Sequence, residues 1–107
     1  MPLTWTEDAP TMVGKVTLVE LQHVDARGRV LLFEHMWGEI TRVDRSAGIF
    51  VDLKGAHAGR DLALPADLDR FTRANRGLYK LESTGEEIED PDFLSTWTLQ
   101  HKDQVGL

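Results

Sequence analysis

The clearest pattern in the chain is a pair of apolar, β-branched runs between Gly38 and Gly55. The runs are Ile40–Val43 and Ile49–Leu53, and a polar turn that starts with Asp and ends with Gly separates them. Two such runs around a short turn are typical of a β-hairpin. The second run alternates strictly, so we expect one of its faces to be buried in a core. The residues expected on that face are Ile49, Val51 and Leu53.

Other segments also alternate over short stretches that end in turn residues. Val13–Val24 predicts a long strand, and Arg29–Trp37 predicts its antiparallel partner. Gly38 interrupts this second run, so we expect the chain to bend there, as at the corner of a barrel. Shorter strands are expected at Arg60–Leu64, Leu78–Glu82 and Glu87–Glu89.

The last strand and one helical candidate complete the pattern. Phe93–Gln100 is predicted as the closing strand, with Trp97 and Leu99 facing inward. Leu64–Phe71 is the helical candidate, because its proline occupies an allowed first-turn position and Leu68 and Phe71, three positions apart, would share one face of a helix. We therefore expect at most one short helix, around residues 65–74.

Seven or eight short strands with frequent turns predict a mainly β protein. Gly38–Gly55 resembles the strand-turn-strand of SH3-like barrels, including those of nucleic-acid-associated modules. The expected fold is a small antiparallel SH3-like barrel or a partly open barrel. Gly77–Trp97 resembles small bacterial proteins, a resemblance from which no activity follows. We expect residues 1–12 to form an irregular arm and residues 13–107 to form a single β domain.

The composition is that of a folded, acidic protein. Of its 107 residues, 41% are hydrophobic and 28% charged, which is enough for one core. The absence of cysteine excludes disulfides and thiolate chemistry. The net charge of −6 disfavours long-range attraction of nucleic acid, and six acids against Lys102 concentrate it in residues 83–107. The first residues do not resemble a secretion signal, and the longest uncharged apolar run, Val30–Phe33, is too short for a bilayer. A cytoplasmic protein without a membrane partner is expected.

The sequence contains no catalytic or metal-binding signature. Its histidines, His23, His35, His57 and His101, lack metal-ligand spacing, and surface positions explain them equally well. His23 and His35 lie on strands predicted to pair, so they could approach each other across the ladder. No serine stands in a Gly-x-Ser-x-Gly motif. We therefore predict no catalytic residue, metal or cofactor.

Two aromatic residues are predicted to bind a ligand. Trp37 stands beside Gly38, where the groove of an SH3-like barrel often carries an aromatic residue. Phe50 is expected on the outward face of the hairpin, as the floor of this groove. Packing in the core is the alternative for Trp37. Trp5 is expected to pack on the body of the domain or on a second subunit.

Arginines form the second candidate surface. Arg70, Arg73 and Arg76 recur every three residues, and Arg60 and Arg45 would join them if the loops come together. Guanidinium groups bind phosphates and carboxylates, so Arg70 and Arg73 are predicted ligand-binding residues. Interleaved aspartates offer the alternative of a solvated face whose charges pair with one another.

These features lead to three functional hypotheses. The first is a non-catalytic protein-interaction module, such as an adaptor, a regulator or a toxin-neutralising partner, which exists as a monomer or a homodimer. The second is a module that binds nucleic acid or an anionic ligand through Arg60, Arg70, Arg73 and Arg76. The third is a small hydrolase or lyase that pairs His35 or His57 with a carboxylate. The sequence favours the first and does not identify the partner.

Overall fold

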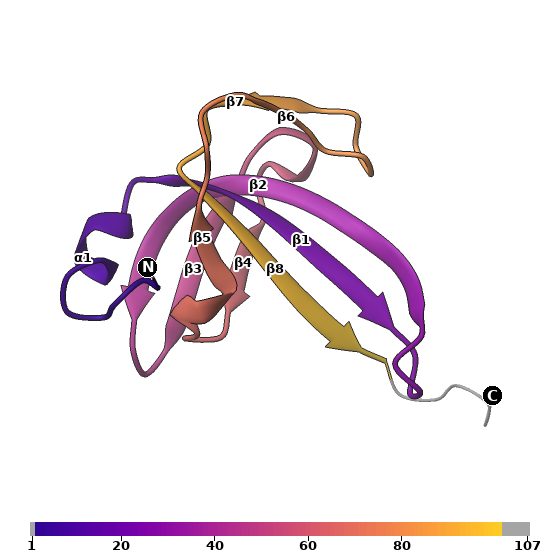
Figure 1. Ribbon diagram of the computed structural model, residues 1–107. Helices are drawn as coiled ribbons and strands as arrows, with labels where there is room; N and C mark the ends of the chain where they lie inside the picture. Colours follow the sequence, from indigo (N-terminus) through magenta and orange to yellow (C-terminus); the bar gives the residue numbers. More distant parts are fainter. Residues whose placement is uncertain (1, 102–107) are drawn as a thin grey trace.

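The computed structural model describes residues 2–101. Strands make up most of the regular structure in this part of the chain, which confirms the mainly β fold class (Figure 1). In chain order the elements are α1 (Ala9–Met12), β1 (Val16–Val24), β2 (Val30–Asp44), β3 (Gly48–Leu53), the 3-10 turn η1 (Gly55–His57), β4 (Asp61–Leu64), the 3-10 turn η2 (Leu68–Arg70), β5 (Phe71–Arg73), β6 (Leu78–Lys80), β7 (Glu87–Glu89) and β8 (Phe93–Gln100).

Six strands form one curved sheet in the order β4-β3-β2-β1-β8-β5, and β6 pairs with β7 in a separate hairpin. The strands β4 and β5 are free edges, so the sheet is not closed into a barrel. The partly open alternative is therefore the form that the structure has. The strands β1 and β8 run parallel, whereas the other pairs of this sheet are antiparallel.

The hydrophobic core lies on one face of this sheet. Alternate residues of β3 are buried there, as the sequence predicts, and Phe50 and Asp52 between them are more exposed. The short link from β4 to β5 contributes Leu68 to this core, and Leu64 and Phe71 at its two ends belong to the same buried cluster. The buried cluster comprises Leu3, Ala9, Met12, Val19, Met36, Ile40, Ile49, Val51, Leu53, Leu64, Leu68, Phe71, Phe93 and Trp97.

The α-helix lies at a different place from the one expected. Helix α1 is inside the segment predicted as an irregular arm, and it buries Ala9 and Met12. Within residues 65–74 the only helical element is the 3-10 turn η2, which buries Leu68, and strand β5 follows it from Phe71. The prediction used the spacing of these two apolar residues, and a single 3-10 turn satisfies that spacing equally well.

Gly38 does not interrupt its strand, because β2 continues through it from Val30 to Asp44. The corner expected at Gly38 is absent, and a glycine is required at this position for a different reason. A Cβ atom at residue 38 would collide with the backbone carbonyl of Asp52 on the neighbouring strand β3. Only glycine lets β2 and β3 approach this closely.

The predicted hairpin of β2 and β3 is present, and its turn is fixed by Asp44. One carboxylate oxygen of Asp44 accepts hydrogen bonds from the backbone N–H groups of Ser46 and Ala47, each at 2.8 Å. These two bonds, that of Ala47 first, and the guanidinium of Arg42 hold the pKa of Asp44 below its ordinary value. Gly48 closes the turn at a φ of 121°, which disfavours any side chain.

The hairpin of β6 and β7 lies across the outer face of the large sheet (Figure 1). Its Leu81 is buried and, with Tyr79, borders a hollow of about 200 Å³ beside Leu18. The turn is fastened to β2 through Ser83: the N–H of His35 donates to Ser83 Oγ at 2.8 Å, and the N–H of Ser83 donates to His35 Nδ1 at 3.2 Å. This hairpin therefore covers part of the edge of β2.

Candidate functional site

A three-stranded arm extends beyond the core (Figure 1). We define the arm as residues 22–33 of the β1–β2 hairpin with residues 98–100 of β8. Its outermost pairs are Val24 with Val30 and Val24 with Gln100. Leu99, which the sequence predicts to face inward, lies on the arm with 47% of its surface exposed. That expectation was wrong because alternation does not show where along a strand the core ends.

The most exposed apolar stretch of the described chain is on this arm. Four consecutive residues of β2 form it, and we call Val30–Phe33 the apolar segment. Their exposed fractions are 47% for Val30, 57% for Leu31, 53% for Leu32 and 47% for Phe33. Contiguous exposed apolar surface of this kind marks an interaction site. The sequence signals this surface through its four consecutive apolar residues. A strand that buries only one face needs apolar residues only at alternate positions.

The backbone of Phe33, at one end of the apolar segment, is also free along one side. The N–H and C=O groups of His35 point away from β1, because both bond Ser83. Backbone groups alternate in direction along a strand, so those of Phe33 point to the same side. No hydrogen-bond partner for the backbone of Phe33 exists on that side among residues 2–101. The arm thus presents an unpaired strand edge together with exposed apolar side chains.

Polar groups gather at the base of the arm around Glu34. One carboxylate oxygen lies 3.1 Å from His23 Nε2, and the other lies 3.8 Å from His57 Nε2. His23 Nδ1 is in turn 2.8 Å from His101 Nε2, and the two rings stack. Across the strands His23 stands between Leu32 and Leu99. This network joins β1, β2, β8 and η1, and so fixes the arm to the body.

The structure places His23 and His35 on opposite faces of the sheet. Glu20 is the residue opposite His35, and it is three positions from His23 along β1. An odd separation puts two side chains of a strand on different faces, so the expected approach of the two histidines does not occur. Each ring meets a carboxylate instead, and His35 Nε2 lies 3.3 Å from Glu20.

These histidine–carboxylate pairs are of the type that the third hypothesis requires, but their ring nitrogens are not available to a substrate. His35 uses Nδ1 for Ser83 and Nε2 for Glu20. His57 uses Nε2 for Glu34, and its Nδ1 is buried without a partner in the described structure. Proton transfer needs a nitrogen within reach of the substrate. Among residues 2–101 no group of three His, Asp or Glu side chains is arranged to hold a metal ion.

Trp37 and Phe50 lie on the same outer face but in different surroundings. Trp37 is half-buried, and its Nε1–H donates to Glu86 Oε2 at 3.2 Å. Phe50 lies under the guanidinium of Arg42, 5.4 Å from the ring centroid. The Glu39–Asp52 pair separates the two aromatic residues in the sheet. The structure therefore does not combine Trp37 and Phe50 in one groove.

Glu86 accepts two hydrogen bonds at the place where the β6–β7 hairpin meets η1. Its Oε2 atom also accepts the N–H of Ala56 at 3.1 Å. Burial acts to raise the pKa of Glu86, but the hydrogen bonds from Trp37 and Ala56, the nearby Thr84 side chain and the charge of His57 outweigh it. The net result is a pKa below the ordinary value for a glutamate.

The predicted arginine surface is largely paired with aspartates. Arg70 Nε lies 3.5 Å from Asp67, and Arg73 Nη2 lies 2.6 Å from Asp8. Arg76 is more loosely paired, at 3.8 Å from Asp90. Arg45 is apart from them and lies over the ring of Trp5, 5.7 Å from its centroid.

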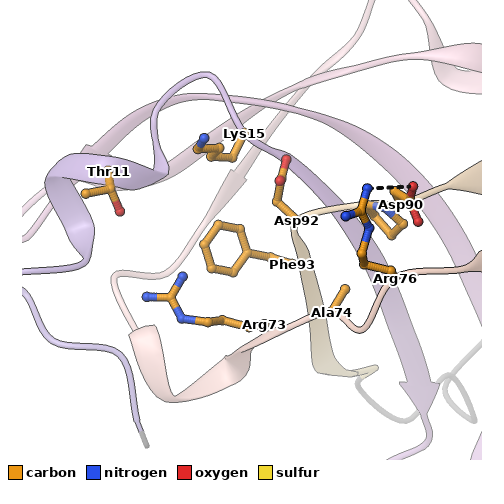
Figure 2. Close-up of a pocket in the computed structure, with 9 residues that line it drawn as sticks. Thr11, Lys15, Arg73, Ala74, Arg76, Asp90, Asp92 and Phe93 are labelled. Carbon is orange, nitrogen blue, oxygen red and sulfur yellow. Dashed lines mark ion pairs between the residues drawn. The ribbon is translucent and has the colours of Figure 1, made fainter.

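Two of the predicted arginines border a hollow of about 410 Å³. Figure 2 shows Arg73 beside the ring of Phe93 and Arg76 at the opposite side, with Lys15 above. Asp90 and Asp92 line the same hollow, so negative charge offsets the three cations. Arg60 and Arg70 are not among its lining residues.

No protein-family model, curated protein or solved structure matches this chain. The resemblance to SH3-like barrels therefore stays a prediction. In the part of the chain that the structure describes, no helix has the length and apolar character needed to cross a membrane.

Proposed function

We propose that this protein is a non-catalytic protein-interaction module that binds its partner through the arm. The observation that carries the proposal is the apolar segment Val30–Phe33, whose four side chains are 47–57% exposed on a free strand edge. Such an edge binds another protein by adding a strand, and the side chains on its two faces provide specificity. The burial of this apolar surface supplies the free energy.

A retention experiment tests this function by placing a charged residue on the free strand edge of β2. The full chain is immobilised at physiological salt and exposed to an extract of its native cells. Phe33→Glu is compared with Leu78→Glu, which charges a leucine outside the arm that is even more exposed, at 62% against 47% for Phe33. We expect the unmodified chain and Leu78→Glu to retain the same protein, and Phe33→Glu to lose it. Equal retention by both variants, or none by the unmodified chain, would overturn the proposal.

A second candidate function is the binding of an anionic ligand in the hollow of Figure 2. It is supported by Lys15, Arg73 and Arg76, which line one hollow although they come from different segments. Single-stranded RNA and inorganic phosphate are suitable probes, because their binding depends on salt if these cations contact phosphate. Lys15→Ala with Arg76→Ala should then weaken binding at low salt. No change in fluorescence anisotropy of labelled RNA, and no competition by phosphate, would remove this candidate.

A further inference from the structure

We infer that the partner of the arm is a second copy of this chain, paired antiparallel with the first along the free edge of β2. This inference rests on the proposed function, because it names the partner of the same surface. Two copies related by a twofold axis place one segment against itself in reverse direction. A strand edge is suited to this, because its N–H and C=O groups complement those of an identical antiparallel strand.

The length of the free edge fits such a pair. At one end the edge is closed by Ser83, which bonds the backbone of His35. At the other end the chain leaves the strand in a turn, where the N–H of Gly28 donates to the carbonyl of Asp25. Between these limits lies the apolar segment, and an axis near Leu32 would place Leu31 of one copy opposite Phe33 of the other. Apolar cross-strand pairs of this kind stabilise sheets.

The side chains along the edge are apolar on both faces. Leu32 shares a face with His23 and Leu99, and Phe33 points to the other face. The pairing of β1 with β2 shifts register between His23 and Val24, so Leu31 has no partner residue on β1. A partner strand therefore needs apolar residues at every position rather than at alternate ones. The apolar segment of a second copy has that property, because none of its four residues is polar.

The distribution of charge also favours an antiparallel copy. The tip of the arm carries Arg27 and Arg29, both exposed, whereas Glu82 precedes the serine that closes the edge. Antiparallel pairing brings the tip of each copy to the closed end of the other, so arginine approaches glutamate twice. Residues 25–35 carry two acids and two arginines, so this surface is neutral in a chain of net charge −6. Two acidic molecules can meet there without the repulsion that their other surfaces cause.

Sedimentation velocity over a wide range of protein concentration tests the inference. We expect the unmodified chain to change from monomer to dimer as its concentration rises. Phe33→Glu should weaken the dimer about thirtyfold or more, as expected for the loss of a central anchor. Leu78→Glu should leave the dissociation constant unchanged. A monomer at every concentration, or a dimer that Phe33→Glu does not weaken, would overturn the inference.

A charge exchange tests the antiparallel arrangement. Arg27→Glu and Glu82→Arg should each weaken the dimer about fivefold, and the double variant should restore it. Arg76→Glu, which reverses an exposed charge between β5 and β6 and outside the arm, is the matched control and should have no effect. If the double variant is weaker than either single variant, the two copies do not meet in this arrangement and the inference is wrong.

Hydrogen exchange tests the inference on the unmodified chain, so that no substitution is needed. The amide of Phe33 should exchange more slowly at concentrations where the dimer forms, while that of Leu78 should not change. Equal exchange of Phe33 at all concentrations would contradict the inference. A chain that stays monomeric but retains a different protein through Phe33 would refute the second copy and leave the proposed function intact.

Discussion

At the scale of single residues, Glu86 joins three parts of the molecule. Its carboxylate accepts hydrogen bonds from Trp37 on β2 and from Ala56 in η1, while the residue itself belongs to the β6–β7 hairpin. No alternation pattern predicts such a contact, because Trp37 and Glu86 are 49 positions apart. The ionised form of Glu86 is the form that these donors stabilise.

The lowered pKa of Glu86 implies a pH-dependent contribution to stability. Because its folded-state pKa lies below the ordinary value of 4.5, the contribution is present above that value and is lost as the pH falls through the folded-state pKa. Glu86→Gln should cost about 1 kcal/mol of unfolding free energy at pH 7. The cost should become smaller at an acidic pH below the folded-state pKa of Glu86, where the wild-type carboxyl is protonated. Urea unfolding at both pH values measures it, and an equal cost at both would contradict the assignment.

Trp37 is expected to act mainly as a structural residue. Trp37→Ala removes a half-buried ring and the Nε1–H donor of Glu86, so we expect a loss of about 2–3 kcal/mol. The thermal midpoint should fall by about 10 °C or more. An unchanged midpoint together with the loss of a bound partner would instead support the predicted role of Trp37 in ligand binding.

At the scale of elements, the close contact of β2 with β3 decides the path of the sheet. Gly38 stands opposite Leu53, and the strand continues through it because the residue has no Cβ. The long strand β2 can therefore pair with β3 at one end and carry the arm at the other.

Gly38→Ala should be one of the most destabilising small substitutions in the chain. The added methyl group meets the backbone carbonyl of Asp52, which cannot move without separating two strands, so we expect a cost of about 3 kcal/mol. Gly28→Ala is the control: its surroundings are open, and only its positive φ of 83° opposes a side chain, at about 1 kcal/mol. Denaturant unfolding compares the two, and an equal cost would contradict the role of Gly38.

At the scale of the whole molecule, the structure separates a packed body from an arm. The body buries the core cluster on one face of the sheet, and the β6–β7 hairpin covers part of the other face. The arm consists of strands that continue beyond the core cluster, and although its Val24 is buried, the exposed residues Val30–Phe33 and Leu99 contribute little to folding. A surface that does not stabilise the fold is free to serve binding.

Replacing an apolar side chain by alanine should affect stability differently in the body and in the arm. Ile40→Ala removes a fully buried side chain and should cost about 3–4 kcal/mol of unfolding free energy. Leu31→Ala removes a side chain that is 57% exposed and should change the stability of the monomer by about 0.5 kcal/mol or less. Urea unfolding at a low protein concentration, where association is absent, measures both. A large cost for Leu31→Ala would show that the arm belongs to the folding core.

The sequence by itself determined the local elements of this protein. Alternation identified β3 and its buried face, and Asp44 with Gly48 identified the turn before it, because these signals depend on neighbouring residues. The spacing of Leu68 and Phe71 predicted that the two side chains share a face, and both are buried, but it did not distinguish a helix from a 3-10 turn followed by a strand. Most strands were therefore predictable, since strand formation depends on local side-chain pattern.

Only the tertiary structure decided where the core ends and which distant residues meet. The Val30–Phe33 run is visible in the sequence, but its exposure depends on the end of β3 at Leu53 and on the absence of any element beside the arm in the described structure. The pairing of arginines with aspartates and the contact of Trp37 with Glu86 likewise depend on strand order and register. A local pattern tells which side chains share a face, whereas burial depends on what the rest of the chain places against that face.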